Sequence, residues 1–426
     1  MNTEILKEII VENEKFILNS VKDVIPRLGL NLPAISSKVC MFYGVRRSGK
    51  SFLLFDLFRK YKDFALYLDF EDERLTGFTV NDFSKIKDTF LELKPHLINR
   101  KGLIFLLDEI QNIEGWEKYA RRMVEKEDVK VFCAGSSSKI TPQGIHTSLR
   151  GRSWSVEVLP FSFREFIQTK NLQPDQKDIF YGTNKTLLKK YFQEYLRYGG
   201  FPEIIFLETE FEKKKILGEY MEAMFFKDLV ERFEIKNIHL LDALREKIFS
   251  SFSTKCSLTS FYKQFQGKFP FSKDSLFLYY KYFLESMLIF EARKFSESSY
   301  KRLRNPAKVY LADLGLSKKI TSSDFGRLLE NIVFLQLHRK DYEIFYFEEN
   351  NECDFVVKKD EEWSVYQVTW QLNEGNRERE IKGLLNAAKF FKLKEGTIIT
   401  NDEESEQEYQ GINIRVVPIW KWLILS

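Results

Sequence analysis

Eight residues, Gly44–Ser51, have the types and spacing of a phosphate-binding loop, G-x-x-x-x-G-K-[S/T]. Gly44 and Gly49 let the backbone turn so that successive N–H groups face an anion, and the start of a following helix adds its positive dipole end. Lys50 would bridge the β- and γ-phosphates of a nucleotide, and Ser51 would offer its hydroxyl to Mg²⁺. The residues expected to contact the nucleotide are Gly44, Val45, Arg46, Arg47, Ser48, Gly49, Lys50, Ser51 and Phe52.

Two carboxylates, Asp108 and Glu109, follow the apolar run 103–107, L-I-F-L-L. Such a run is typical of a strand buried on both faces of a parallel sheet, and open α/β sheets bind ligands at the carboxyl ends of their strands. Asp108 would hold the metal directly or through water, and Glu109 would polarise the attacking water as a general base. The alternative is a buried strand that ends in two solvated acids.

Three further residues would complete a hydrolytic site. Ser136, just beyond the apolar segment 129–134, is placed to contact the γ-phosphate or the lytic water, unless it only forms a serine turn. Arg150 and Arg152, within L-R-G-R, could reach a γ-phosphate in their own or a neighbouring subunit as an arginine finger. The alternative is that both arginines pair with surface acids.

Carboxylates in the last third of the chain raise the question of a nuclease. A restriction-type nuclease needs a helix Glu, an Asp at a strand end and Glu-x-Lys on the next strand, because carboxylates hold Mg²⁺ while Lys stabilises developing charge. The corresponding positions are Glu330, Asp354, Gln367 and Thr369. Gln367 is a neutral and weaker metal ligand, and Thr369 carries no charge. We expect a degenerate site used for binding or architecture, unless Arg379 or Lys382 supplies the missing cation.

The elements needed to position the nucleotide site are present in the sequence. An apolar, β-branched and aromatic stretch at 39–43 predicts a strand before the loop, and 52–58 has the pattern of a helix after it. Residues 64–70 and 129–134 predict two more strands. An additional strand between the loop and the acidic strand, with a glutamate beside the metal-binding aspartate, separates this chain from most kinase and GTPase arrangements. The pattern favours a hydrolase.

Residues 240–305 carry a local excess of positive charge, with twelve Lys or Arg against six Asp or Glu, in a chain of net charge +4. The helices and strands predicted there are 244–252, 258–265, 272–283, 288–291 and 307–311. This is the outline of a winged helix-turn-helix, which commonly binds DNA through its second motif helix. There are two alternatives to DNA binding. The basic face is only solvated, or the module is structural or docks a protein. The basic residues expected on that helix and the wing are Lys273, Lys281, Arg293, Lys294, Lys301, Arg302 and Arg304.

Together these motifs resemble the prokaryotic AAA-type ATPases that carry a C-terminal restriction-nuclease-like domain of unknown function. The resemblance runs from residue 44 to residue 423 in the family's order and implies ATP in preference to GTP. It also implies a lid over the nucleotide base at Tyr198–Glu203, with Pro202 near the nucleotide, although a structural turn is the alternative. The matching segments are G-V-R-R-S-G-K-S, L-L-D-E-I-Q, A-G-S-S-S, L-R-G-R, L-P-F-S-F-R-E-F, Y-G-G-F-P-E, V-Y-L-A-D-L-G-L, L-L-E-N-I-V, E-C-D-F-V-V and P-I-W-K-W-L.

Composition limits the other classes of protein. With 44% hydrophobic and 30% charged residues, the sequence describes a soluble globular protein with an ample core. The cysteines form no C-x-x-C pair, which disfavours a zinc or redox site and suits a reducing cytoplasm. No apolar run approaches the roughly 18 residues of a membrane span, and the amino terminus lacks a secretion signal. We expect a cytoplasmic protein without a membrane partner. The four cysteines are Cys40, Cys133, Cys256 and Cys353.

The predicted fold is α/β, with a P-loop parallel-sheet ATPase core, a helical lid, a winged-helix-like module and a C-terminal α/β restriction-nuclease-like domain. The predicted function is Mg²⁺-dependent ATP binding and hydrolysis coupled to movement of the C-terminal modules, with DNA bound through 240–305 or a protein as partner. A homo-oligomer is expected if an arginine acts in trans. The alternatives are a nucleotide-occupancy switch with little turnover and an ATP-gated nuclease. The predicted domains are 1–165, 166–238, 239–318 and 319–426.

Overall fold

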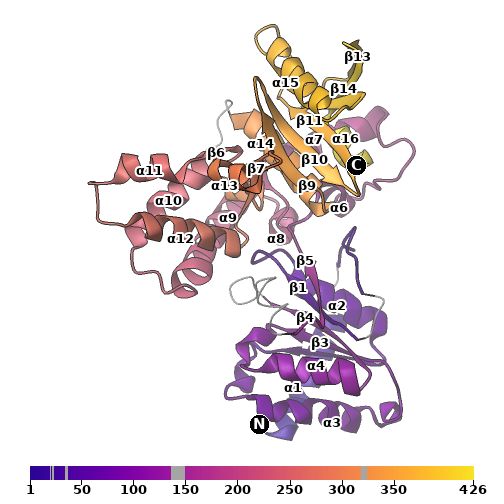
Figure 1. Ribbon diagram of the computed structural model, residues 1–426. Helices are drawn as coiled ribbons and strands as arrows, with labels where there is room; N and C mark the ends of the chain where they lie inside the picture. Colours follow the sequence, from indigo (N-terminus) through magenta and orange to yellow (C-terminus); the bar gives the residue numbers. More distant parts are fainter. Residues whose placement is uncertain (20, 22–23, 34–36, 136–148, 318–323) are drawn as a thin grey trace. The chain divides into compact units, whose positions relative to one another are not determined.

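The computed structural model divides into two compact units, each built around its own β-sheet (Figure 1). The first unit comprises residues 1–159 and the second residues 160–426. The structure describes the whole chain except residues 20, 22–23, 34–36, 136–148 and 318–323.

The sheet of the first unit has five parallel strands. They are β1 (Val39–Tyr43), β2 (Ala65–Asp69), β3 (Leu103–Asp108), β4 (Val129–Ala134) and β5 (Ser153–Glu157). Their order is β2-β3-β4-β1-β5, and every neighbouring pair is parallel, which confirms the predicted P-loop α/β core. In the sheet it is β4 that separates the loop strand β1 from the acidic strand β3. The strand predicted at 64–70 instead forms the edge strand β2.

Helices cover both faces of this sheet, because alternate strand residues point to opposite sides. Met41 packs among the residues of one face, and its neighbours Cys40 and Phe42 pack on the other. The first face is covered by three helices and the second mainly by the helix that follows the loop. The helices are α1 (Thr3–Asn19), α3 (Phe83–Leu93) and α4 (Trp116–Lys126) on the first face, and α2 (Lys50–Tyr61) on the second.

The second unit contains a mixed nine-stranded sheet, ordered β13-β14-β12-β11-β10-β9-β7-β8-β6. Helix α15 (Arg377–Phe390) packs Leu384 and Ala388 against Val356 and Ile398 of this sheet. The strands are β6 (Thr254–Cys256), β7 (Ile289–Lys294), β8 (Ala307–Leu311), β9 (Glu343–Glu348), β10 (Glu352–Lys359), β11 (Glu362–Val368), β12 (Glu395–Thr400), β13 (Ser405–Tyr409) and β14 (Ile412–Pro418).

The strands predicted as a wing belong to this same sheet. β7 and β8 form an antiparallel pair, as a wing does, but β7 also pairs in parallel with β9 through Arg293 and Lys294. The basic segment is therefore joined to the C-terminal part of the chain by main-chain hydrogen bonds. The four domain boundaries drawn from the sequence stay predictions.

Helices make up most of the rest of the second unit, including the segment predicted as a helical lid. Among the described residues, no helix is long and apolar enough to cross a membrane. Besides α15, the helices are α6 (Phe163–Thr169), α7 (Gly182–Tyr198), α8 (Pro202–Phe206), α9 (Glu210–Ala223), the π-helix η5 (Met224–Glu231), α10 (Ile238–Ser250), α11 (Leu258–Phe265), α12 (Lys273–Glu285), α13 (Ser299–Arg304), the 3₁₀ turn η6 (Leu314–Leu316), α14 (Phe325–Arg339) and α16 (Ile419–Leu425).

Candidate functional site

The phosphate-binding loop begins at a glycine that no other residue could replace without a clash. Gly44 has φ 149°, and a Cβ there would lie 2.2 Å from the main-chain oxygen of Val158. Val158 is held in that position because its N–H donates to the carbonyl of Tyr43 at 2.8 Å. The segment that leaves β5 therefore packs directly against the start of the loop. Farther along, Arg47 and Gly49 adopt left-handed backbone conformations, with φ 68° and 96°.

Lys50 begins helix α2 and is buried inside the loop. Its ammonium donates to the carbonyl oxygens of Gly44 and Val45, at 3.1 and 3.0 Å. The first turn of α2 also directs its main-chain N–H groups and positive dipole end towards the loop. A fixed ammonium and a helix N-terminus thus converge on the loop, which is the arrangement that phosphate binding requires.

Arg27 supports the loop from outside the motif. Its guanidinium donates to the carbonyl oxygen of Ser48 at 2.9 Å and to that of Leu159 at 2.5 Å. It therefore ties the loop to the end of the first unit. Sequence reasoning missed Arg27, because a lone arginine in an irregular segment has no motif around it.

Asp108 lies at the carboxyl end of β3, and its side chain meets that of Ser51. The Ser51 hydroxyl forms a hydrogen bond with the Asp108 carboxylate, and the Tyr67 hydroxyl donates to Asp108 Oδ2 at 3.0 Å. Burial, together with the nearby carboxylates of Glu109 and Asp69, raises the pKa of Asp108 to about 7, although the two hydrogen bonds act to lower it. The loop and the acidic strand, predicted separately, thus form one site.

Glu109 turns out of the strand at a left-handed residue, with φ 46°. Its N–H donates to Asp108 Oδ1 at 3.1 Å, and the Gln111 side-chain amide donates to its carboxylate. Non-glycine residues occupy this backbone region rarely, and they concentrate at functional sites. Gln111 therefore positions the carboxylate predicted to be the base. Tyr67 and Gln111 were not singled out from the sequence, although Gln111 lies within the motif L-L-D-E-I-Q.

The two candidate finger arginines differ in their surroundings. Arg150 is exposed and has a left-handed backbone, with φ 46°. Arg152 is also exposed, and its Nε lies 2.8 Å from Glu125 Oε1, so it makes a surface ion pair of the kind weighed as the alternative. Ser136 lies outside the described residues. Finger roles for the arginines and a γ-phosphate contact for Ser136 stay predictions.

In the second unit, Glu330 and Asp354, two positions of the predicted nuclease-like pattern, both contact a lysine. The ammonium of Lys308, from β8, lies 3.0 Å from Glu330 Oε1 and 2.9 Å from Asp354 Oδ1. It also contacts Glu352 Oε1 at 2.7 Å. Lys308 was missed, although a lysine inside the otherwise apolar segment A-K-V-Y-L is a signal that the sequence contains.

The other two predicted positions do not offer metal ligands. The amide oxygen of Gln367 accepts from the N–H of Asp354 at 3.1 Å, and its amide nitrogen donates to Glu380 Oε2 at 2.6 Å. The Thr369 hydroxyl donates to the carbonyl oxygen of Gln371 at 3.2 Å. Glu380 had not been anticipated.

Neither of the two cations expected to compensate reaches Glu330 or Asp354 through an ion pair of its own. Arg379 binds Glu380, and Lys382 pairs with Glu378 on the same helix. The cation that contacts Glu330 and Asp354 is Lys308, which comes from an earlier strand.

Family models match three segments of the chain. Residues 36–167 match the family model of an AAA domain, and residues 189–324 and 325–422 match two domains of unknown function. An uncharacterized protein of Methanocaldococcus jannaschii is 35% identical over 98% of this chain and 95% of its own length. The chain belongs to the family of AAA-type ATPases with C-terminal domains of unknown function.

The chain is also similar to further proteins at lower identity. An uncharacterized protein of Haemophilus influenzae is 26% identical over 88% of this chain and 92% of its own. Among solved structures, the Thermotoga maritima RuvB Holliday junction branch migration motor is 13% identical, with a TM-score of 0.26. The match covers 71% of this chain and 94% of the RuvB chain. The S. cerevisiae Hsp104–ADP complex is 15% identical, with a TM-score of 0.27, and the match covers 66% of this chain and 38% of the Hsp104 chain.

Gly199 and Gly200, predicted as part of a lid, lie beside the buried carboxylate of Asp313. Asp313 accepts from the N–H of Gly200 at 2.7 Å and from that of Gly315 at 2.8 Å. Burial raises the pKa of Asp313 to about 7, whereas these two hydrogen bonds lower it. The geometry gives the motif Y-G-G-F-P-E a structural role at the end of α7, while a contact between Pro202 and the nucleotide stays a prediction.

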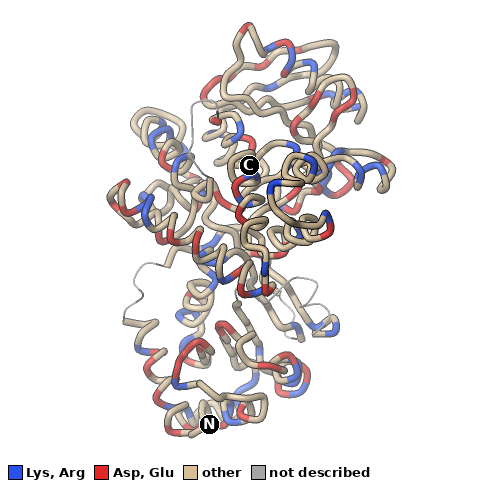
Figure 2. The backbone as a smooth tube through the Cα atoms, turned by 90° about the vertical axis from the view of Figure 1, so that its left-hand side faces the viewer, with Lys and Arg blue, Asp and Glu red and all other residues tan. Residues whose placement is uncertain are grey.

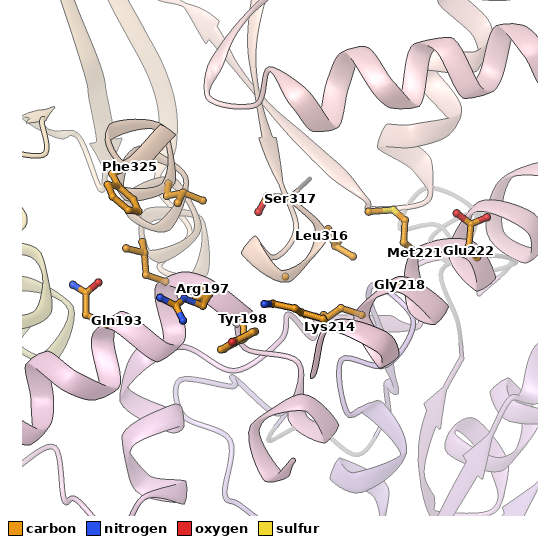
Figure 3. A pocket seen from close by; sticks show the side chains of 14 residues that line it. Gln193, Arg197, Tyr198, Lys214, Gly218, Met221, Glu222, Leu316, Ser317 and Phe325 are labelled. Atoms are coloured by element: carbon orange, nitrogen blue, oxygen red, sulfur yellow. The ribbon is translucent and has the colours of Figure 1, made fainter. Parts of the chain in front are cut away.

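A cavity of about 590 Å³ opens beside this turn (Figure 3). Arg197, Tyr198 and Lys214 lie on one side of it, and Leu316 and Phe325 lie on the other (Figure 3). The second unit thus has a pocket lined by residues of α7, α9, η6 and α14.

Proposed function

We propose that this chain binds ATP at Gly44–Ser51 and hydrolyses it with Mg²⁺, and that hydrolysis moves the C-terminal segments. The observation that carries the proposal is the meeting of Ser51 with Asp108. A hydroxyl and a carboxylate are the hard oxygen ligands that Mg²⁺ prefers, so the residues present fit this metal. When bound, Mg²⁺ would neutralise charge on the β- and γ-phosphates.

Different residues of the chain would bind the phosphates, bind the metal and activate the water. The loop N–H groups and Lys50 hold the phosphates, Ser51 and Asp108 bind the metal, and Glu109 takes a proton from the attacking water. Gln111 holds the Glu109 carboxylate in place. In this assignment Arg150, or Arg152 once it leaves Glu125, stabilises the charge that develops on the γ-phosphate.

Replacing Lys50 tests whether the loop binds the nucleotide. We expect Lys50→Ala to weaken the binding of a fluorescent ATP analogue at least about tenfold, because it removes a charge-assisted contact to the phosphates. Lys60→Ala, an exposed lysine on the same helix, should leave binding unchanged. Equal affinity in Lys50→Ala and the unmodified chain would refute the assignment of the loop. Tight nucleotide retained on purification, with slow turnover, would instead indicate an occupancy switch.

Replacing Tyr67 tests the support of the metal-binding aspartate. Tyr67 is buried and its hydroxyl donates to Asp108, so Tyr67→Phe leaves that carboxylate without one of its donors. We expect the Mg²⁺ concentration for half-maximal hydrolysis to rise about tenfold, as is usual when a partner of a metal ligand is lost. Tyr61→Phe, at the end of α2, is the control. An unchanged Mg²⁺ requirement in Tyr67→Phe would exclude this role.

As a finer step, we propose that the protein contacts DNA through α13, between the wing strands β7 and β8. Helix α13 has no buried residue, and Tyr300 and Leu303 are about two-thirds exposed. By contrast, Lys281 on α12 and Arg293 on β7 pair with Glu285 and Glu291. Cationic side chains beside an exposed aromatic ring suit phosphates and bases. Among the described residues, the structure gives no ion pair for Lys301, Arg302 or Arg304.

Salt dependence measures this contact directly. Three phosphate contacts on duplex DNA give a slope of log K against log salt of about −2.7. The triple variant Lys301→Glu, Arg302→Glu, Arg304→Glu should flatten the slope and weaken binding on every sequence tested. Elsewhere in the part of the chain that the structure describes, Lys and Arg are interspersed with Asp and Glu (Figure 2). Unchanged DNA binding in the triple variant would rule out α13, and a flat response in the unmodified chain would argue against DNA.

A further inference from the structure

Lys308 is a charged residue in a strand whose five residues are all buried. It is 3% exposed, and its ammonium lies 2.7 Å from Glu352 Oε1, 2.9 Å from Asp354 Oδ1 and 3.0 Å from Glu330 Oε1. An ammonium has three N–H donors and no acceptor. One oxygen from each of three carboxylates therefore satisfies the whole hydrogen-bonding capacity of this lysine.

Each of the three carboxylates is fixed by a second donor. The Tyr310 hydroxyl donates to Glu330 at 2.8 Å, and the N–H of Val368 donates to Asp354 Oδ2 at 3.0 Å. The Lys255 ammonium lies 2.8 Å from Glu352 Oε2. The carboxylates are thus held around the ammonium rather than drawn to it from flexible positions.

The surroundings keep Lys308 charged. Burial alone would lower the pKa of Lys308, but the carboxylates of Asp354 and Glu330 raise it well above its usual value. Burial also raises the pKa of Glu330 to about 8, although Lys308 lowers it. Removing one member of such a buried group leaves an uncompensated charge, which is far more costly than losing a surface ion pair.

Two of these carboxylates, Glu330 and Asp354, stand at the positions where a restriction-type nuclease would hold Mg²⁺. Mg²⁺ binds oxygen at 2.0–2.1 Å and Ca²⁺ at 2.3–2.6 Å, so a metal that engaged these three oxygens would need the space of the ammonium. Within the described part of the chain, no group of three or more His, Cys, Asp or Glu side chains is arranged to hold a metal ion. We propose that the Lys308 ammonium takes the place of a divalent cation in this nuclease-like site, and that removing it would open a metal site formed by Glu330, Glu352 and Asp354.

A lysine in a nuclease-like site can either assist a bound metal or replace it. A lysine that assists a metal in cleaving phosphodiesters must leave carboxylate oxygens to that metal. Here a single ammonium contacts all three carboxylates, so the lysine is the resident cation and the site neither binds metal nor cuts nucleic acid. Lys308 also joins β8 to helix α14, which carries Glu330, and to strand β10, which carries Asp354. This inference is independent of the nucleotide site.

The test measures Mn²⁺ binding to the full chain without nucleotide. Binding is detected as a loss of the electron paramagnetic resonance signal of free Mn²⁺. Lys308→Ala should gain one site per chain, at least about tenfold tighter than any site of the unmodified chain, since Glu330 and Asp354 would lose their cation and Glu352 would lose one of its two. The double variant Lys308→Ala, Asp354→Asn should lose that site. Lys255→Ala is the matched control, because it removes a cation from Glu352 but leaves Lys308, and it should gain no site.

Other outcomes would overturn the proposal. A Mn²⁺ site in the unmodified chain that Asp354→Asn abolishes would show that the site is already open, as would plasmid cleavage that depends on Asp354. A folded Lys308→Ala that gains no site would also contradict it. If Lys308→Ala does not fold in metal-free buffer, Mn²⁺ should restore its folding, and failure of Mn²⁺ to do so would equally reject the proposal.

Discussion

Glu109→Gln should lower ATP turnover by about 10²–10⁴-fold and leave ATP binding intact, because amide and carboxylate have the same shape but only the carboxylate accepts a proton. The geometry supports a specific loss. Glu109 lies at the end of β3, where its N–H contacts Asp108 and its carboxylate is held by Gln111. The measurement is steady-state phosphate release together with equilibrium binding of ATP.

The control for this variant is Glu114→Gln, which makes the same change at an exposed glutamate five residues later. It should retain full turnover. Hydrolysis by Glu109→Gln at the rate of the unmodified chain would overturn the assignment of the base. Loss of ATP binding in Glu109→Gln would instead mean that this carboxylate is part of the binding site.

Gly200→Ala should destabilise the second unit by about 3 kcal/mol or more, because the new methyl group meets main-chain atoms that no side-chain rotation can move. A Cβ at Gly200 would lie 2.1 Å from the carbonyl oxygen of Phe161. That contact is fixed, since the N–H of Phe161 donates to the carbonyl of Gly200 at 2.7 Å. A shift of residue 200 would also break its hydrogen bond to the buried Asp313. Thermal or urea unfolding measures the loss.

Gly218→Ala is the matched control for this loss of stability. Gly218 lies within helix α9 and is exposed, and a Cβ at this position would meet no neighbouring atom within 4 Å. Alanine favours a helix over glycine by about 1 kcal/mol, so this variant should be slightly more stable than the unmodified chain. A Gly200→Ala protein that unfolds at the same temperature as Gly218→Ala would contradict the structural role of the turn.

The nucleotide site was predictable because its motif is local. The spacing of Gly44, Gly49 and Lys50 specifies a backbone turn and a helix start, and an apolar run before Asp108 and Glu109 specifies a buried strand. Both elements are found where the sequence places them. The meeting of the two motifs then follows from the rule that parallel strands present their carboxyl ends at one edge of the sheet.

Contacts between distant segments were not predictable in the same way. Lys308 meets Glu330 and Asp354 only because β8 enters the same sheet as β10, and no local pattern specifies this pairing. The partnership of Gly200 with Asp313 likewise joins residues more than a hundred positions apart. Arg27 supports Ser48 from a segment without a motif. Sequence patterns therefore identified the residue types of each site, whereas the partners that fix them required the fold.

The most direct test of the central claim is steady-state ATP hydrolysis by the unmodified chain in Mg²⁺ and in EDTA, with and without DNA. We predict phosphate release that requires Mg²⁺ and that Lys50→Ala abolishes, and a higher rate with DNA would identify DNA as the coupled partner. Bound ATP with no Mg²⁺-dependent phosphate release under any of these conditions would contradict hydrolysis and identify the chain as a nucleotide-occupancy switch.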